Sequence, residues 1–442
     1  MATPARRCAY AVTRRVFEHD AYTDRAFRAE AERAQLSGRD RAFAMRLAYG
    51  VVQRRATLDH VVGSLADRPA GDLDAAVLAA LRLGAYQLLF MDGVADHAAV
   101  TESVDLAKAA GSRGHGLVNA VLRRTAREGR AVLDQLGEAT PAEAALRHSH
   151  PEWIAQTWWD QLGVDQALAL MRADNEPAES AVRANTLRSI PDDVIAELER
   201  EGVAARPDPR VPEALVLAQA YDLHGSDLFA RGAIMPQSRA SMLVARAVDP
   251  QRGERVLDLC AAPGAKTTHL AALMGGEGEV VSVDLDARRA RDVSRNAERL
   301  GAENVEVVVG DAAQPAFGSG YDRVLVDPPC SDLGTLQSRP DARWRKSPEQ
   351  VADLSGLQAR ILDAAAPAVR PGGRLVYSTC TISPDENERQ MEAFMARNAS
   401  FEAVDLSGAF PGVLAADRRF VQTLPHRDST DGFFIAAFEQ HG

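Results

Sequence analysis

Four cysteines occur in the 442-residue chain, and each stands alone in the sequence. They are Cys8, Cys260, Cys330 and Cys380. They form no C-x-x-C pair and no Cys/His cluster with zinc-binding spacing, so the sequence predicts neither a disulfide framework nor a metal site. An important thiol in this chain would therefore act singly, as a nucleophile or as an acid–base group.

An acid or a thiol follows each of five apolar segments that are expected to be strands. A single acid after a strand is most often a helix N-cap, and a single buried cysteine is most often a small core residue. Five such residues in succession would share one rim of a parallel sheet, and a ribose-bearing cofactor beside a reacting thiol explains that pattern better. The residues are Asp258 with the turn 260–266, Asp284, Asp311, Asp327 with Pro328, Pro329 and Cys330, and Cys380.

The first of these segments, "VLDLCAAPGAKTTHLAAL" from Val256, contains a Gly-Ala-Lys-Thr turn that suggests phosphate binding. The P-loop pattern G-x-x-x-x-G-K-[ST] requires glycines where this chain has Cys260 and Ala265. The dinucleotide pattern G-x-G-x-x-G is absent because Gly264 stands alone in the turn. The sequence thus argues against a P-loop and, by itself, leaves the ligand of this turn open.

Three parts of the chain are expected to position these residues. Residues 231–442 alternate apolar strands with amphipathic helices, which predicts a Rossmann-like α/β domain with a parallel sheet covered on both faces. Residues 1–140 place apolar residues at helical spacing and predict an all-helical domain, with Ser37 as an expected N-cap. Residues 141–230 predict a small α+β connector whose tryptophans are buried on an amphipathic helix rather than stacked on bases. The helical domain ends in a basic helix that carries Arg123, Arg124, Arg127 and Arg130.

Composition places the chain among soluble globular proteins with a net charge of −11. Residues 1–150 carry 21 Lys+Arg against 18 Asp+Glu, or +3, and the remainder carries 30 against 44, or −14. This modest asymmetry points to the N-terminal part as the first contact for a nucleic acid, and solvated helical faces explain it equally well. No apolar run is long enough to span a bilayer and the N-terminus lacks the apolar core of a secretion signal, so we expect a cytosolic protein without membrane contact.

Several segments resemble a known family. The motifs "DLCAAPGAKTTHLA", "DPPCS", "RPDARWR" and "YSTCTISPDENE" are similar to the successive signatures of RNA cytosine-5 methyltransferases of the Sun family. The helical segments "RDRAFAMRLAYGVVQRR" and "GLVNAVLRR" resemble the NusB-like RNA-binding domain of the branch that acts on bacterial small-subunit (16S) ribosomal RNA. The resemblance covers nearly the whole chain. It implies S-adenosylmethionine-dependent formation of 5-methylcytosine in that RNA, and we expect a monomer without a metal.

The resemblance also implies a cofactor site. The turn would hold the methionine part of S-adenosylmethionine, which has no phosphate, through Cys260, Ala261, Ala262, Pro263, Gly264, Ala265 and Lys266. Asp284 would accept hydrogen bonds from the ribose hydroxyls, Asp311 would contact the adenine edge, and Asp327 is expected to border the cofactor. Lys266 would point towards the reacting centre.

Two positions depart from the family pattern, which usually has glycine where Ala265 and Asp332 stand. If the first position needs a positive φ, alanine would cost about 1 kcal/mol there. The second change could alter the loop over the base. Neither change removes a reacting group.

Cytosine carbon 5 is a poor nucleophile, and adding a thiolate at carbon 6 activates it. Asp327 is the candidate acid at ring nitrogen 3. From the residues alone either Cys330 or Cys380 could attack, because a Pro-Cys motif supplies the nucleophile in DNA cytosine-5 methyltransferases. The resemblance to the RNA family implies that Cys380 attacks and Cys330 assists product release. Cys260 is expected to contribute backbone contacts and Cys8 to be structural.

Two other classes of function are compatible with parts of the sequence. One is an RNA-binding ribosome-assembly or antitermination-type factor without essential catalysis, which the retained reacting residues disfavour. The other is a DNA or small-molecule methyltransferase, which the appended helical domain disfavours. The loop "RPDARWRK" from Arg339 to Lys346 places four cations around one tryptophan, and we expect it to contact RNA rather than to be only a solvated loop.

Overall fold

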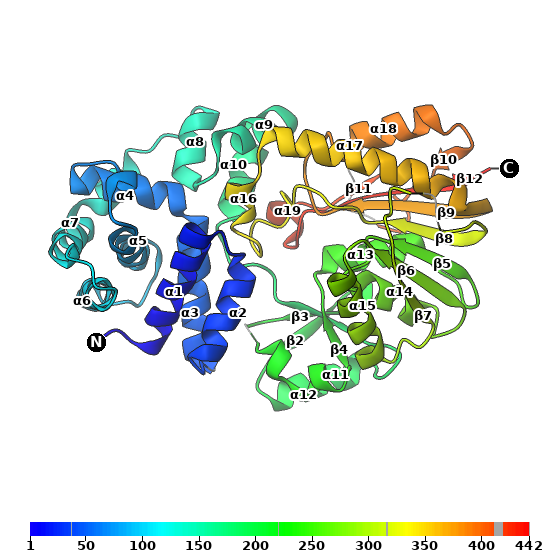
Figure 1. Cartoon of the computed structure of the whole chain (residues 1–442), viewed down its shortest axis with the longest axis horizontal. Coiled ribbons are helices and arrows are strands. Elements are labelled where there is room, and N and C mark those ends of the chain that lie inside the picture. The colour runs from blue at the N-terminus through cyan, green and yellow to red at the C-terminus, as the bar shows by residue number, and fades with distance from the viewer. Residues whose placement is uncertain (37, 220, 315–316, 411–418, 442) are drawn as a thin grey trace. The chain divides into compact units, whose positions relative to one another are not determined.

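The computed structural model describes residues 1–36, 38–219, 221–314, 317–410 and 419–441. Ser37, the expected N-cap, lies outside the described residues. The chain forms two compact units, one of Met1–Pro177 with Leu336–Arg345 and one of Ala178–Thr335 with the chain from Lys346 onward (Figure 1). The predicted three-part division at residues 140 and 230 stays a prediction, and the compact units place residues 141–177 with the helical part.

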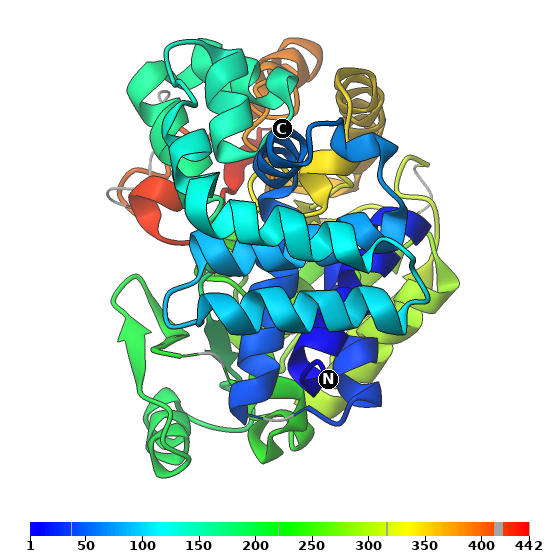
Figure 2. The same ribbon diagram turned by 90° about the vertical axis from the view of Figure 1, so that its left-hand side faces the viewer.

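The first unit is all-helical, which confirms the prediction for the N-terminal part. Its longer helices are α1 (Pro4–His19), α2 (Thr23–Arg33), α3 (Gly38–Gln53), α4 (Arg55–Ala66), α5 (Ala75–Phe90), α6 (Asp96–Ala109) and α7 (His115–Asp134). Helix α5 is apolar on nearly every side, so it can be stable only when it is surrounded. It packs against α1, α3, α4, α6 and α7, and Figure 2 shows these blue and cyan helices side by side. The Asp74 side chain caps α5 by accepting from Ala76 N at 3.1 Å and Val77 N at 3.2 Å.

Three further helices follow in this unit: α8 (Pro141–His148), α9 (Glu152–Leu162) and α10 (Val164–Ala173). Trp158 on α9 is fully buried, and its ring meets that of His150 edge-on at 5.4 Å between centroids. The prediction that tryptophan here is buried is confirmed for Trp158.

A segment from the second half of the chain, Leu336–Arg345, is also part of the helical unit. It ends in the short helix α16 (Ala342–Arg345). The Trp344 indole donates to the carbonyl of Val52 at 2.8 Å, and Arg345 pairs with Asp341 at 2.9 Å. The fully buried Arg343 guanidinium donates to five oxygens, those of the Gln53, Ser149, Asp174 and Leu336 carbonyls and the Asn175 side chain, at 2.9–3.3 Å.

The expectation that the loop Arg339–Lys346 contacts RNA through its cations and its tryptophan is therefore wrong for its central residues. Arg343 and Trp344 use their donors inside the helical unit, because a buried guanidinium must satisfy its N–H groups within the protein. Arginines around a tryptophan give the same sequence motif whether the side chains face RNA or pack inside the protein. The motif alone therefore could not show which of these applies here.

The second unit begins with a small antiparallel sheet. Its strands are β1 (Ala181–Ala184), β2 (Ala205–Asp208), β3 (Val211–Leu217) and β4 (Ile234–Pro236), in the order β2-β3-β1-β4. The helices α11 (Pro191–Arg200) and α12 (Asp227–Ala230) accompany it. Two buried side chains tie it to the larger sheet domain: Arg183 donates to Thr268 at 2.9 Å, and Asn185 donates to the Leu300 carbonyl at 2.8 Å.

The larger sheet contains five parallel strands in the order β9-β8-β5-β6-β7. They are β5 (Arg255–Leu259), β6 (Glu279–Asp284), β7 (Val305–Val309), β8 (Tyr321–Val326) and β9 (Val369–Thr379). The predicted Rossmann-like fold is confirmed, but the sheet is mixed rather than purely parallel. The strands β10 (Phe401–Ala403), β11 (Val421–Gln422) and β12 (Phe434–Gln440) are antiparallel additions beyond β9.

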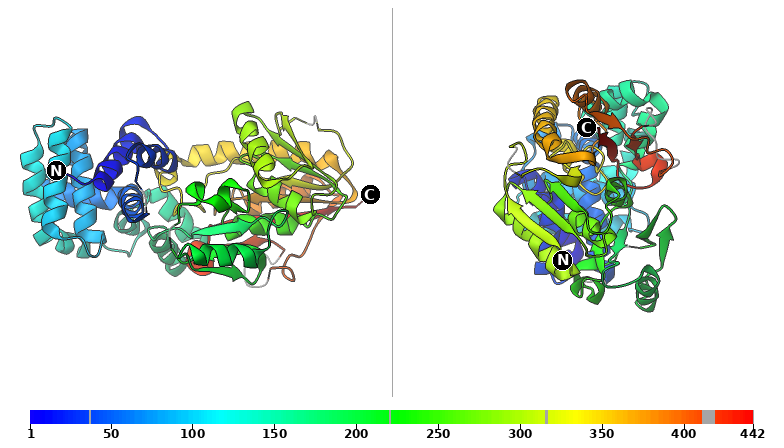
Figure 3. Two further views of the ribbon diagram at one scale, coloured as in Figure 1. Left: turned by 90° about the horizontal axis from the view of Figure 1, so that it is seen from below. Right: turned by 90° about the vertical axis from the view of Figure 1, so that its right-hand side faces the viewer.

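Helices cover both faces of this sheet (Figures 1 and 3). Val256, Leu325 and Val376 face α13 (Arg239–Val248) and α14 (Ala265–Leu273), with α15 (Ala287–Leu300) on the same side. Their neighbours Leu257 and Val326 face α17 (Pro348–Ala365) and α18 (Glu388–Arg397). This alternation explains why the strands read as nearly continuous apolar runs, since both faces are buried.

No helix in the described part of the chain is long and apolar enough to cross a bilayer. The predicted cytosolic location stays a prediction.

Replacing Arg343 by Ala should lower the free energy of unfolding by roughly 3 kcal/mol or more, because several buried carbonyl oxygens lose their donor at once. Denaturation of the full chain, followed by circular dichroism, measures the change. Arg339 lies on the same segment with an exposed side chain, and Arg339→Ala should change stability by no more than about 0.5 kcal/mol. Equal effects of the two substitutions would contradict the anchoring role of Arg343.

Candidate active site

The residues singled out in the sequence lie at or just beyond the carboxyl ends of the five parallel strands, which share one rim of the sheet. The strand order runs from β5 to β6 and β7 on one side, and continues with β8 and β9 on the other. The turn after β5 therefore lies at the switch point of the sheet, where ligands of such folds bind.

The turn after β5 is held by backbone and side-chain contacts from β6 and α15. Cys260 has φ 65° and Gly264 has φ 95°. A Cβ on Gly264 would lie 3.1 Å from Cα of Val293 on α15, so glycine is required both for its conformation and for this close approach. The Asn296 side chain on α15 donates to the Pro263 carbonyl at 2.9 Å and so fixes the turn to that helix.

Ala265, the first departure from the family pattern, is the first residue of α14 and is not among the residues with a positive φ. The strain considered for this position therefore does not arise, since a helical φ suits alanine.

The two acids expected to contact a nucleoside lie at the ends of β6 and β7. Asp284 is buried and accepts hydrogen bonds from Ala262 N and Asp286 N, each at 3.1 Å. It thereby joins the end of β6 to the turn after β5. Asp311 accepts from Ala313 N at 3.0 Å and from the Gln314 side chain at 3.3 Å. Both acids are oriented by local hydrogen bonds at the rim of the sheet.

Asp258, the acid inside β5, is buried beneath the turn. One carboxyl oxygen accepts from the Thr267 hydroxyl at 2.6 Å, and the other has no protein partner. Burial raises the pKa of Asp258 to about 7, and the negative charge of Asp327 acts in the same direction.

Lys266 and Asp327, two of the predicted catalytic residues, form an ion pair at 2.7 Å. The Ser378 hydroxyl donates to the other carboxylate oxygen of Asp327, also at 2.7 Å. Burial by itself would lower the pKa of Lys266, but the adjacent Asp327 carboxylate outweighs it and holds that pKa above its ordinary value. Lys266 also interacts electrostatically with Cys380. The turn, the end of β8 and the end of β9 therefore meet at this lysine.

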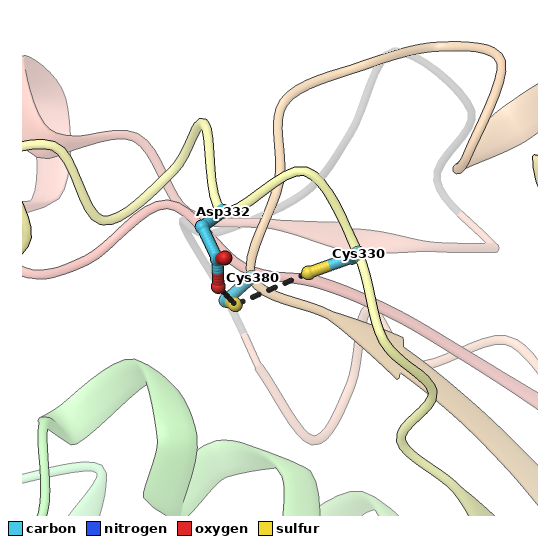
Figure 4. Close-up of side chains that lie close together, drawn as sticks. All are labelled: Cys330, Asp332 and Cys380. Carbon is cyan, nitrogen blue, oxygen red and sulfur yellow. Dashed lines mark hydrogen bonds between the residues drawn. The ribbon is translucent and has the colours of Figure 1, made fainter. Parts of the chain in front are cut away.

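The thiols of Cys330 and Cys380 lie 3.2 Å apart although 50 residues separate them in the sequence. Cys330 follows β8 and is buried, and Cys380 follows the adjacent strand β9 and is partly exposed. Figure 4 shows the two sulfur atoms facing each other from the two loops. Of the four predicted catalytic residues, the structure therefore places Lys266 against Asp327 and Cys330 against Cys380.

Asp332, the second departure from the family pattern, contacts the second of these thiols. Its backbone has φ 61°, in the left-handed region that glycine adopts without strain. The Cys380 thiol donates to the Asp332 carboxylate at 3.3 Å (Figure 4). Lys346 lies 3.7 Å from the same carboxylate and donates to the Cys330 carbonyl at 3.2 Å.

Glu386, for which the sequence predicted no role, is fully buried beneath the two thiol loops. One of its carboxyl oxygens accepts from Ser331 N and from the Gln358 side chain, each at 2.9 Å, and the other bonds the Ser331 hydroxyl. The Ser331 hydroxyl also lies 2.6 Å from that of Thr381. Ser331 and Thr381 directly follow Cys330 and Cys380, so this network fixes the two thiol-bearing loops to each other.

Burial raises the pKa of Glu386, which favours the protonated carboxyl. The only sign of Glu386 in the sequence was its place in "SPDENE", where an acid also suits a helix start. Its role depends on contacts with Ser331 and Gln358, 55 and 28 residues away.

The two remaining cysteines are placed differently. Cys260 lies in the turn, and burial raises the pKa of its thiol, as do the neighbouring acids Asp327 and Asp284. Cys8 is buried in the core of the helical unit, and burial raises its pKa to about 11. Neither thiol is suited to act as a thiolate nucleophile at neutral pH.

Comparison with known families covers both units. The sequence profile of the 16S rRNA methyltransferase RsmB/F family matches residues 245–439, that of the NusB family matches residues 3–127, and that of an RsmF/B-like ferredoxin-like domain matches residues 150–224. The chain is 36% identical to the probable ribosomal RNA small subunit methyltransferase B of Synechocystis sp. over 98% of both chains. It is 34% identical to the protein of the same name from Bacillus subtilis over 96% of both chains.

Solved structures are similar as well. The crystal structure of PH0851 matches with a TM-score of 0.83 at 28% identity, over 100% of this chain and 99% of that chain. The structure of NSun6 from Pyrococcus horikoshii with SFG matches with a TM-score of 0.62 at 25% identity, over 66% of this chain and 98% of that chain.

Replacing Glu386 by Ala should misalign the two thiol loops and lower the rate of the reaction at this site at least tenfold, since it leaves the Ser331 N–H and the Gln358 amide without an acceptor. Glu386→Gln should retain activity within a few-fold, because an amide has the same shape and can accept from both donors. Rates are measured alongside thermal midpoints, so that loss of fold is separated from loss of alignment. Equal loss in both variants would show that the carboxyl itself, rather than its hydrogen bonds, is needed.

Proposed function

Because the chain belongs to the 16S ribosomal RNA methyltransferase RsmB/F family, we propose that it methylates carbon 5 of a cytosine in small-subunit ribosomal RNA through a covalent bond from Cys380 to carbon 6. The predicted family is confirmed. Its general activity, methylation of ribosomal RNA with S-adenosylmethionine as the donor, is confirmed with it. The observation that carries the finer proposal is the 3.2 Å contact between the Cys330 and Cys380 thiols. The expected monomeric state and the expected absence of a metal stay predictions.

The rim of the sheet suits this donor. Asp284 would accept from the ribose hydroxyls, Asp311 would contact the adenine edge, and Asp327 would border the positive charge. The buried Asp258 oxygen without a protein partner lies beneath the turn. The turn 260–266 would hold the methionine part, with Gly264 allowing close approach. When bound, S-adenosylmethionine supplies a methyl group on a positively charged sulfur.

In the proposed first step, Cys380 adds to the cytosine ring. The thiol loses its proton to water, the sulfur forms a bond to carbon 6, and the electron pair of the C5–C6 double bond moves so that carbon 5 becomes nucleophilic. Negative charge grows at ring nitrogen 3, and the Lys266–Asp327 pair supplies a proton there while Ser378 holds the carboxylate in place. Lys266 also stabilises the Cys380 thiolate through its positive charge.

In the proposed last step, the product is released from Cys380. The proton on carbon 5 leaves to water, the bond from sulfur to carbon 6 breaks, and its electron pair returns to Cys380 as the ring double bond re-forms. The proton on ring nitrogen 3 returns to the Lys266–Asp327 pair. Cys330 is the group placed to assist, because its sulfur lies against that of Cys380. The two thiols thus have different roles although they come from adjacent strands.

The helical unit is the proposed RNA-binding part, since its NusB match covers residues 3–127. Helix α7 exposes Arg123, Arg127 and Arg130, as the sequence predicted for a basic helix. Arg124 pairs with Asp67 at 2.9 Å, and Arg127 pairs with Glu128 at 3.4 Å. Exposed arginines of this kind contact phosphates without reading sequence.

The two cysteines should give opposite results when each is replaced by alanine. Cys330→Ala should accumulate a covalent protein–RNA adduct that survives denaturing electrophoresis, because release is impaired. Cys380→Ala should form no adduct and transfer no labelled methyl group, because the nucleophile is absent. Cys8→Ala, distant in sequence and buried in the helical core, is the control and should behave like the unaltered protein. Undiminished transfer by Cys380→Ala would overturn the assignment.

The site of methylation can be tested in cells. Bisulfite sequencing of 16S ribosomal RNA should show a protected cytosine in cells that contain the protein, and this protection should be lost when the gene is deleted and regained with the intact gene but not with Cys380→Ala. Loss of a methyl group from another atom or another RNA would contradict the cytosine-5 proposal.

A further inference from the structure

Three side chains with metal-binding atoms converge at the ends of β8 and β9. The sulfur atoms of Cys330 and Cys380 and a carboxylate oxygen of Asp332 all lie within 4.8 Å of one another. Within the described residues, no other trio of Cys, His, Asp or Glu side chains meets this condition. Figure 4 shows the Cys330 sulfur and an Asp332 carboxylate oxygen both directed at the Cys380 sulfur.

We propose that Cys330, Asp332 and Cys380 form a binding site for one thiophilic divalent cation, of the class of Zn²⁺ and Cd²⁺. Occupancy of this site would block both reacting thiols and so inhibit the enzyme. The blocking of methyl transfer rests on the proposed function, whereas the binding of the cation depends only on the three ligands.

The distances suit such an ion. Zinc binds thiolate sulfur at about 2.3 Å and carboxylate oxygen at about 2.0–2.2 Å, so tetrahedral neighbours lie roughly 3.5–3.8 Å apart. The contacts of Cys380 with Cys330 and with Asp332 are 3.2 and 3.3 Å. Each must widen by only a few tenths of an ångström, which side-chain rotation provides. Three protein ligands with a fourth position open to water is a common zinc arrangement, and two thiolates favour soft cations over Mg²⁺ or Ca²⁺.

The charges also suit such an ion. On binding, each thiol releases its proton to solvent and donates an electron pair to the metal, so two thiolates, one carboxylate and one dication leave a net charge of −1. The Lys346 ammonium lies 3.7 Å from the Asp332 carboxylate and is tied to the Cys330 carbonyl, so it neutralises this charge without displacing a ligand. The partial exposure of Cys380 and Asp332 provides a path for the ion.

Asp332 supplies the one proposed ligand that is not a thiol. With glycine, only the two thiols would remain as ligands. The φ of 61° at Asp332 is one that glycine adopts without strain, so Asp332→Gly is a matched substitution that removes the third ligand and preserves the loop.

The test is a titration of the reduced full-length protein with Cd²⁺, kept under a phosphine reductant so that the thiols cannot form a disulfide. Ultraviolet absorption from cadmium–thiolate bonds should rise to saturation at one ion per chain. Zn²⁺ should displace the Cd²⁺ and abolish the absorption. Methyl transfer to RNA should fall with the same midpoint as the binding curve.

Single substitutions test which side chains bind the cation. Asp332→Gly should weaken cadmium binding at least tenfold, because loss of even an outer partner of a metal ligand costs roughly 10–100-fold. Cys330→Ser and Cys380→Ser should each remove the saturable absorption, whereas Cys8→Ser and Cys260→Ser should leave it. Unchanged cadmium affinity in Asp332→Gly, or saturable absorption that persists in Cys380→Ser, would overturn the site.

Failure of this inference can be told from failure of the proposed function. Methyl transfer without saturable cadmium binding would overturn the metal site and leave the enzyme assignment intact. Saturable binding by a protein that transfers no methyl group would support the site and overturn the function.

Discussion

The adjacency of two parallel strands, β8 and β9, is the constraint on which the site depends. Parallel neighbours end at the same rim, so Cys330 and Cys380 reach contact across 50 residues of sequence. Strand adjacency alone places the two loops only near each other. The buried Glu386 carboxyl fixes the two loops to each other. It accepts hydrogen bonds from Ser331, which follows Cys330, and the Ser331 hydroxyl bonds the hydroxyl of Thr381, which follows Cys380. Chemistry that needs two sulfur atoms at contact distance therefore depends on a carboxyl that touches neither.

The connection between β8 and β9 also passes through the helical unit. After β8 the chain leaves the sheet unit, contributes Leu336–Arg345 to the helical unit, and returns at Lys346 to begin the run that leads into α17. Arg343 holds this excursion through five buried hydrogen bonds, and Trp344 adds another. The residues on either side, Asp332 and Lys346, lie beside the thiols. The backbone therefore runs directly from the loop that carries Cys330 into the helical unit and back.

Electrostatics at the rim follows from the crowding of acids there. Asp258, Asp284 and Asp327 lie near the turn, and burial with mutual repulsion raises the pKa of Asp258 to about 7. Lys266 offsets this charge by pairing with Asp327, and its own pKa is held high in return. An acidic rim suits a positively charged methyl donor, and the ion pair with Lys266 orients Asp327.

The sequence by itself determined the elements and the type of turn. Apolar runs with alternating helices predicted the Rossmann-like sheet, and the absence of two glycines argued against a P-loop, because these features depend on period and local conformation. It also nominated Cys330, Cys380, Asp327 and Lys266 through motifs that lie within single short segments.

Only the tertiary structure decided which of these residues touch. Asp332 contacts Cys380 across 48 positions of sequence, and Glu386 bonds Ser331 across 55. Arg343 bonds Gln53 across 290 positions. The contact of the two thiols likewise depends on the adjacency of two strands. A local pattern has the same composition whether its side chains meet solvent or one another. For that reason the cysteines, which lack any metal-binding spacing along the chain, can still form a compact ligand set in the folded protein, and the cation-rich loop expected at RNA serves instead as an anchor.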